Sequence, residues 1–219
     1  MGYDYEKIFF DVVIPGFWDT IYMVSISTFL SVVIGFVIAV IFYVTDSVHG
    51  LSPNRIVNSV TNTIVNIIRS FPFLILMVAL IPLTRVITGS SIGKTAALVP
   101  LTIAGACFFA RLIETSFSMV DEKTVEMAKA TGASNFQIIT QVVLRESVPS
   151  LVQSITNGTI AILSTSAAAG SIGAGGLGAV AIMYGYQNYD SIIMYGTVFI
   201  LVLMVQIIQM IGNKCYKKF

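Results

Sequence analysis

Long uncharged stretches limit the folds open to this chain more than any other feature of its sequence. Asp, Glu, Lys and Arg are absent from residues 20–45, 95–110, 147–189 and 191–213. A helix needs about 20 apolar residues to cross the hydrocarbon core of a bilayer, where backbone polar groups find no water. Only 11% of the residues are charged, against about 25% in soluble domains. The sequence therefore predicts an all-α integral membrane protein with one transmembrane domain in a lipid bilayer.

Five membrane-spanning helices are expected. They cover residues 19–44, 57–82, 95–117, 147–170 and 191–212, and Arg69 and Pro72 interrupt the second. A six-span alternative would divide residues 147–189 in two. The segment from Gly170 to Gly178 holds five glycines, and the residues after it are too few and too polar to cross. We therefore prefer five spans.

Basic residues in the short loops predict the orientation, because Lys and Arg concentrate on the cytoplasmic side of membrane proteins. With the C-terminus inside, the inner side holds Arg55, Lys123, Lys129, Arg145, Lys214, Lys217 and Lys218, and the outer side holds Lys7, Arg85 and Lys94. An odd number of spans places the termini on opposite faces. The charges and the span count thus both favour an outside N-terminus and an inside C-terminus.

The most charged stretch is the inner loop between the third and fourth spans, residues 121–149. It is typical of two short helices joined at Gly132, since glycine suits the left-handed residue that ends a helix. Asp121 is placed to cap the first helix. Ser134, with Gln137 three residues later, has the spacing of a capping box for the second.

The second short helix has an apolar face, because Phe136, Ile139 and Val143 recur at helical spacing. A helix–glycine–helix element with such a face and several charges fits a docking element for another protein. It fits a surface loop packed on its own bundle equally well. The residues alone leave both interpretations open.

A family resemblance favours docking. The loop resembles the Glu-Ala-Ala (EAA) loop of binding-protein-dependent ABC importer permeases. The matching positions are Glu126, Ala128, Gly132 and Leu144, and the departures are Met127, Val142 and Arg145. Because Arg145 stands where the family has proline, we expect the second helix to run further and to break at Pro149.

The resemblance extends from about residue 17 to 212 and includes motifs similar to those of methionine importer permeases. These motifs are Arg69-Ser70-Phe71-Pro72-Phe73, Ile81-Pro82-Leu83-Thr84-Arg85, Gly173-Ala174-Gly175-Gly176-Leu177-Gly178 and Tyr184-Gly185-Tyr186. Residues 17–212 are thus expected to be one type I ABC permease domain with its coupling loop at 121–149.

The resemblance implies an assembly of several chains in the inner membrane of a bacterium. Two copies of this chain would join two ABC ATPase subunits, and an extracytoplasmic binding protein or lipoprotein would deliver methionine in its L or D form. The ATPases would bind ATP and magnesium, so this chain would hold no cofactor, metal or catalytic residue. Glu126 would make a polar contact with the ATPase, and Gly132 would form the turn. Ala128 and Ala133 would allow close approach, and Leu144 would complete the motif.

Five residues are candidates for the translocation path or its gate. Arg69 is ionisable and lies between apolar runs, which indicates function, although snorkelling from the inner end of the span is the alternative. Ser164 and Ser166 lie in a run of small residues that favours close packing at a dimer axis, with substrate contact as the alternative. Gly175 and Gly176 lie in a Gly-x-Gly-x-x-Gly match that follows a membrane helix, not a strand. This match indicates a flexible gate or a tight turn instead of a dinucleotide site.

An ion-gradient-driven secondary transporter or channel subunit is the alternative function. It would need acidic residues deep in the spans, which contain essentially none. A membrane-embedded enzyme would need clustered His, Asp or Glu, and the chain has one His. A net charge of +1 gives no basic face for nucleic acid.

Overall fold

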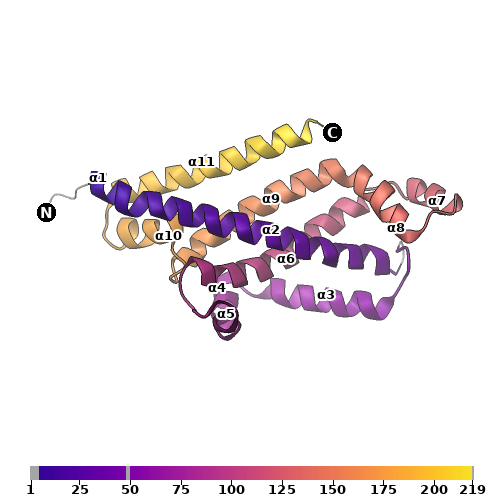
Figure 1. Cartoon of the computed structure of the whole chain (residues 1–219), viewed down its shortest axis with the longest axis horizontal. Coiled ribbons are helices and arrows are strands. Elements are labelled where there is room, and N and C mark those ends of the chain that lie inside the picture. The colour runs from indigo at the N-terminus through magenta and orange to yellow at the C-terminus, as the bar shows by residue number, and fades with distance from the viewer. Residues whose placement is uncertain (1–4, 48–49, 219) are drawn as a thin grey trace.

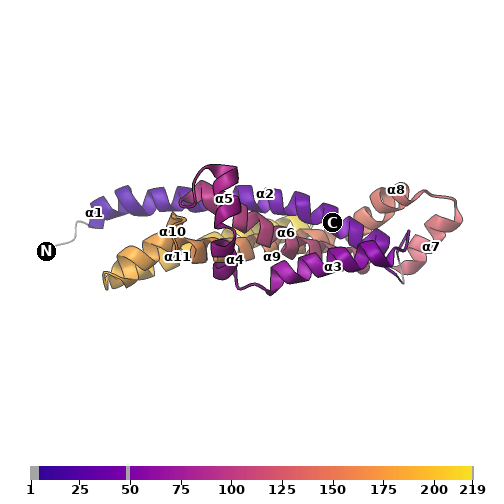
Figure 2. The same ribbon diagram turned by 90° about the horizontal axis from the view of Figure 1, so that it is seen from below.

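Helices form the regular structure of the chain in the computed structural model, which describes residues 5–47 and 50–218. The molecule is elongated, and α7 and α8 lie at one end of its long axis while α1 lies at the other (Figures 1 and 2). α11 runs toward the α7 end (Figure 1). The predicted all-α fold with membrane-type helices is confirmed.

The first helix is longer than the predicted span. It continues through α1 (Tyr5–Ile8), the π-helical turn η1 (Phe9–Val13) and α2 (Ile14–Thr45). Its 41 residues include the expected span 19–44. Pro15 has no backbone N–H to donate, and the wide turn η1 directly before it accommodates the missing hydrogen bond.

The segment of the second predicted span is a bent pair of helices. α3 (Arg55–Ser70) and α4 (Phe73–Ala79) meet at 105°. A proline disfavours helical geometry at the residue before it, and Phe71 before Pro72 is extended, with φ −74° and ψ 131°. A short helix, α5 (Ile81–Thr88), follows and ends at Gly89.

The third and last predicted spans are confirmed as long apolar helices, α6 (Lys94–Ser118) and α11 (Ser191–Tyr216). Between α9 and α11, α10 (Gly176–Val180) and the π-helical η3 (Ala181–Tyr186) form a shorter apolar helix. This helix is shorter than the about 20 residues that a crossing needs, which agrees with the prediction of a single span in residues 147–189.

The second helix of the inner loop and the fourth predicted span form one helix. α8 (Asn135–Gln137), the π-helical η2 (Ile138–Val143) and α9 (Leu144–Gly170) follow one another without a break. Pro149 lies inside α9, so the break expected there is wrong. With arginine instead of proline at position 145, the helix keeps that backbone N–H, and Pro149 removes only one hydrogen bond from a packed helix. The loop between helices is therefore shorter than 121–149.

By length and hydropathy, three helices in the described ranges can cross a membrane, or four if α3 and α4 count as one bent span. α9 is not among them, because polar residues such as Gln153, Asn157 and Ser164 interrupt its apolar sequence.

The packed centre lies between α2, α6 and α9. Phe109 of α6 is fully buried, and Gly158 of α9 makes room for it, since a Cβ at position 158 would overlap the phenyl ring. The same apolar cluster continues past the end of α6 to Val125 of α7 and Ile138 of η2. The loop is thus attached to the bundle by apolar packing.

Candidate functional site

The element that projects at the end of the molecule, residues 121–143, is here called the tip. Its first helix is α7 (Glu122–Ala130), and the Asp121 side chain accepts a hydrogen bond from the Lys123 N–H at 3.0 Å, as predicted. Gly132 adopts φ +82°, the left-handed conformation that the sequence indicates. The N–H of Ala133 donates to the carbonyl of Ala128 at 3.1 Å and closes the turn.

The second helix of the tip begins at the predicted capping box. The Ser134 N–H donates to Gln137 Oε1 at 2.8 Å, and the Gln137 N–H donates to Ser134 Oγ at 3.4 Å. Helix, left-handed glycine and capped helix are therefore confirmed. Together they hold the tip in one shape.

The inner face of the tip differs in part from the predicted one. Val143 is fully buried and Ile139 is half-buried, as the expected face requires, but Phe136 is 76% exposed and Ile138 is fully buried in its place, so the prediction is wrong at Phe136. The reason is the π-helical segment η2, in which residues five apart lie over one another instead of three or four. Ile138 and Val143 therefore share the face that packs on the bundle.

Three apolar residues expected to take part in docking lie on the inner side. Ala128, Ala133 and Leu144 are partly buried and pack against the cluster that contains Ile138 and Val143. In the single chain these three residues therefore help to seat the tip on its own bundle. The close approach that the small size of Ala128 and Ala133 allows is between α7 and η2.

The outer side of the tip exposes two large apolar side chains among polar ones. Met127 is 64% exposed and Phe136 is 76% exposed, and they lie on either side of the Gly132 turn. Large apolar side chains at a projecting, rigid turn are typical of a surface that another protein covers.

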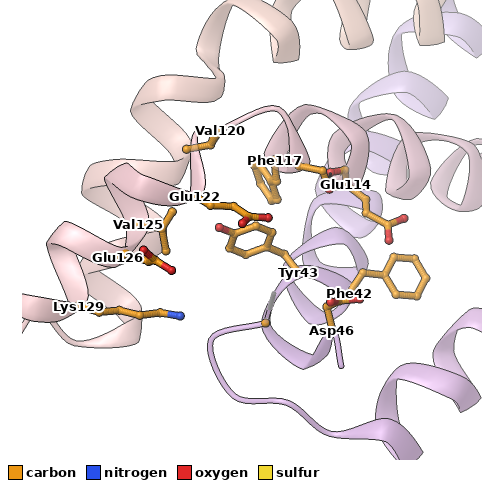
Figure 3. Close-up of a pocket in the computed structure, with 12 residues that line it drawn as sticks. Phe42, Tyr43, Asp46, Glu114, Phe117, Val120, Glu122, Val125, Glu126 and Lys129 are labelled. Atoms are coloured by element: carbon orange, nitrogen blue, oxygen red, sulfur yellow. Dashed lines mark hydrogen bonds between the residues drawn. The ribbon is translucent and has the colours of Figure 1, made fainter. Parts of the chain in front are cut away.

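Glu126 faces a hollow of about 260 Å³ between α7 and the ends of α2 and α6. Figure 3 shows Glu122, Glu126 and Lys129 pointing from α7 toward the side of the hollow formed by Tyr43 and Asp46. Glu114 and Phe117 of α6 line it as well. The hollow has more carboxylates than ammonium groups and has aromatic walls, so the exposed Glu126 at its edge suits a basic side chain from outside the chain.

Arg111 beside this hollow is the hub of a polar cluster. Arg111 Nη1 donates to Glu114 Oε2 at 2.8 Å, between residues three apart on one helix face. Its Nη2 also donates to the side-chain oxygens of Asn62 and Asn66 on α3. The guanidinium lies 4.5 Å from the centre of the Phe42 ring. Arg111 thus ties α2, α3 and α6 together at the tip end.

The asparagines of α3 were not among the residues predicted to be functional. Asn58, Asn62 and Asn66 recur every four residues after the N-cap Asn54, which is the spacing of one helix face. That periodicity was the available signal. It places a polar stripe opposite Arg111.

The candidate path residues fall into two groups. Arg69 and Ser164 are exposed on the single chain. Ser166 is buried, and its hydroxyl donates to the Leu163 carbonyl of the same helix at 2.7 Å. α9 also exposes Gln153 and Asn157, which the sequence reasoning did not single out.

Gly175 and Gly176 form a tight turn held on α2. Both have positive φ, at 85° and 76°. A Cβ on Gly176 would come within 2.8 Å of Thr20 and Met23. The Leu177 N–H donates to Thr20 Oγ1 at 2.8 Å, and the nearby Asp19 pairs with Lys94 at 2.6 Å. Gly176 therefore serves close packing on α2, whereas Gly175 serves the positive φ of the turn.

Within residues 5–47 and 50–218, no three His, Cys, Asp or Glu side chains are grouped so as to hold a metal. The tip offers shape, apolar contact and charge to a partner.

Comparisons with known proteins give one consistent result. Residues 47–216 match the family model described as "Binding-protein-dependent transport system inner membrane component". The Vibrio cholerae "Probable D-methionine transport system permease protein MetI" is 44% identical over 208 residues, or 95% of this chain and 92% of that protein. The Bacillus subtilis "Methionine import system permease protein MetP" is 45% identical over 161 residues, or 73% and 72% of the two chains. A chain of the MetNI methionine ABC transporter in an inward-facing conformation superposes with a TM-score of 0.89 at 39% identity, over 92% of this chain and 93% of that chain.

Proposed function

The chain belongs to the family of binding-protein-dependent transport system inner membrane components, and on this premise we propose that it is the permease subunit of an ATP-driven methionine importer. It is a membrane subunit and not an enzyme. Its relatives are named as methionine permeases, and its fold matches that of a methionine ABC transporter chain along nearly the whole length of both. The observation that carries the proposal is the rigid, projecting tip with its exposed apolar residues and its acidic hollow.

The tip is proposed to dock on a separate ATPase subunit, which binds ATP and magnesium. Met127 and Phe136 would be covered by the ATPase, and Glu126 would receive a basic side chain at the hollow. Gly132 would hold the turn, while Ala128, Ala133 and Leu144 would seat the tip on the bundle. Each member of this set contributes shape or charge, not chemistry.

The continuous helix from Asn135 to Gly170 supplies a physical route for coupling. At about 1.5 Å per residue it is about 50 Å long, which exceeds the thickness of the hydrocarbon core. A displacement of the tip by the ATPase would therefore move the membrane part of α9 directly. This rigid connection is what alternating access by ATP-driven closure requires.

Five crossings with the N-terminus outside and the C-terminus inside are proposed for the chain. The fourth crossing is α9, although it is too polar to pass a hydropathy test. Its exposed Gln153, Asn157 and Ser164 would be unfavourable against lipid, so they are proposed to face an aqueous path. The excess of basic residues on the tip side supports this orientation.

The path is proposed to lie between two copies of this chain. Polar side chains are exposed on α9 and also on α3, where Asn66 and Ser70 lie on the surface. A second copy facing these helices would remove them from lipid and enclose the path. Ser164 and Arg69 are assigned to its wall, whereas Ser166, Gly175 and Gly176 are assigned to packing beside it.

An extracytoplasmic binding protein or lipoprotein is proposed to deliver methionine at the face opposite the tip, in the inner membrane of a bacterium. The ion-gradient-driven alternative is not favoured, because the sequence has no Asp or Glu between residues 47 and 113 or between 147 and 189. Such a transporter needs ion-binding carboxylates at depth.

The test is reconstitution of the chain with its ATPase and binding protein in proteoliposomes. Uptake of labelled methionine that requires ATP is the expected result, and uptake without ATP would contradict the proposal. Glu126→Lys is expected to abolish uptake and weaken co-purification of the ATPase. Glu6→Lys, which makes the same charge change on an exposed residue of α1 at the other end of the molecule, is the matched control.

A further inference from the structure

A second cavity, of about 320 Å³, lies beside the bend between α3 and α4. We call it the bend cavity. α3, α4, α6 and α9 all contribute to its wall. Its lining residues include Arg69, Phe71, Phe73, Phe108, Ile162 and Thr165.

The bend cavity lies at mid-depth of the proposed membrane domain. Its α6 lining runs from Leu101 to Phe108, the middle of the helix Lys94–Ser118. Arg69 lies in the last turn of α3, about 20 Å along the helix from Arg55 at its other end, at ~1.5 Å per residue. Arg69 is therefore too deep for the snorkelling from the inner end that the sequence left as an alternative.

No anionic partner for Arg69 is found among the residues that the structure describes. Among residues 5–47 and 50–218, its guanidinium makes no hydrogen bond or ion pair. A second copy cannot supply one at this depth, because residues 20–45, 47–113, 147–189 and 191–213 contain no Asp or Glu. A cation at membrane depth without a counter-charge is costly and marks a ligand or a path.

The rest of the lining suits a small, mostly apolar ligand. Three phenylalanines and several aliphatic side chains form the wall, and the Thr165 hydroxyl is already bonded to the Ala161 carbonyl of its own helix. Ligand sites are typically apolar cavities of about 300 to 1,000 Å³ with a few polar anchors, so this volume fits a single amino acid. Aromatic rings also make favourable contacts with a thioether sulfur.

We propose that the bend cavity is a transient binding site for the transported amino acid, in which Arg69 receives the carboxylate and the phenylalanine wall receives the thioether side chain. A guanidinium can bind a carboxylate through two parallel hydrogen bonds. The inference rests on the proposed function. It adds that the permease itself selects for a free carboxylate on its substrate.

The test uses the permease–ATPase complex in lipid nanodiscs without binding protein, together with a methionine analogue that carries a photoreactive diazirine in its side chain. Illumination is expected to label this chain on peptides that contain Phe71, Phe73 or Phe108. Unlabelled methionine should suppress the labelling. Methionine methyl ester, which lacks the charged carboxylate, should compete about ten- to a hundredfold less well. This factor corresponds to the free energy that hydrogen bonds to a charged group contribute to binding.

Two variants separate recognition by Arg69 from a structural effect. In Arg69→Gln the acid and the ester should compete equally, and Arg69→Lys should restore part of the difference. In Ala104→Leu the cavity is filled while Arg69 stays, so labelling should fall about tenfold or more. Arg85→Gln, an exposed arginine on α5 outside the cavity, should leave both readouts unchanged.

Three outcomes would overturn the inference. In each case, ATP-driven uptake by the wild-type complex would still support the proposed function. The first is labelling of this chain only outside the bend cavity. The second is equal competition by acid and ester in the wild type. The third is displacement of the label by anionic phospholipid but not by methionine, which would make the cavity a headgroup site.

Discussion

Gly132 provides the sharpest test of the tip. Its φ of +82° is costly for any residue with a Cβ, and a Cβ placed there meets no atom within 4 Å. A substitution therefore introduces backbone strain without a clash. For a β-branched residue such as valine, we expect a strain of about 1–2 kcal/mol.

In the free permease, Gly132→Val can relieve this strain by moving to negative φ, which re-aims the second helix of the tip relative to α7. Docking must then restore the native turn, so the strain is subtracted from the binding free energy. The expected result is an ATPase affinity about five- to thirtyfold weaker than wild type. Gly132→Asn should lose less, since asparagine tolerates the left-handed region.

The assay is titration of the solubilised permease with purified ATPase, accompanied by thermal unfolding of each variant. Gly89→Val is the matched control. Gly89 also ends a helix with φ +76° and also has no atom within 4 Å of an added Cβ, but it lies at the C-terminus of α5 away from the tip. It should show similar destabilisation and unchanged ATPase affinity. Equal affinity loss in both variants, or none in Gly132→Val, would refute the reasoning.

Three other substitutions test the packing that supports the tip and path. Ser134→Ala removes a helix cap and should lower the stability of the tip by about 1 kcal/mol, seen as faster hydrogen exchange of the first turn after residue 134 and unchanged exchange in α11. Arg111→Met leaves Glu114 and two asparagines without their donor and should lower stability by about 1–3 kcal/mol, measured by thermal unfolding in detergent; an unchanged melting temperature would contradict the hub role. Gly158→Ala forces Phe109 to shift and should cost about 1–3 kcal/mol in the same assay, whereas Gly196→Ala, with open space around it, should not.

The features that could be predicted are those that depend on local sequence. Asp121, Gly132 and the Ser134–Gln137 capping box act over three or four residues, so their spacing alone indicates the helix ends that the structure has. The long apolar runs likewise locate α2, α6 and α11. Hydropathy is a property of the segment itself and needs no knowledge of its neighbours.

The features that could not be predicted depend on contacts between distant segments or on a local change of helical period. In the π-helical segment η2 the buried face runs through Ile138 and Val143 and excludes Phe136. A pattern search that assumes 3.6 residues per turn misses such a change of period. The fourth span was expected to be separate from the second helix of the loop, because proline usually breaks a helix. In the structure Pro149 is tolerated inside α9, so the two form one helix.

By itself, the sequence determined that this chain has membrane-type helices and that one charged loop resembles a docking element. It also identified Arg69 as a charged residue between apolar runs. Only the tertiary structure decided what surrounds Arg69. The 105° bend at Pro72 brings the end of α3 against the middle of α6 and α9, and places the exposed Arg69 at the wall of a largely apolar cavity. A proline indicates that a helix must stop, but the direction in which the chain continues is set by how side chains from distant helices pack.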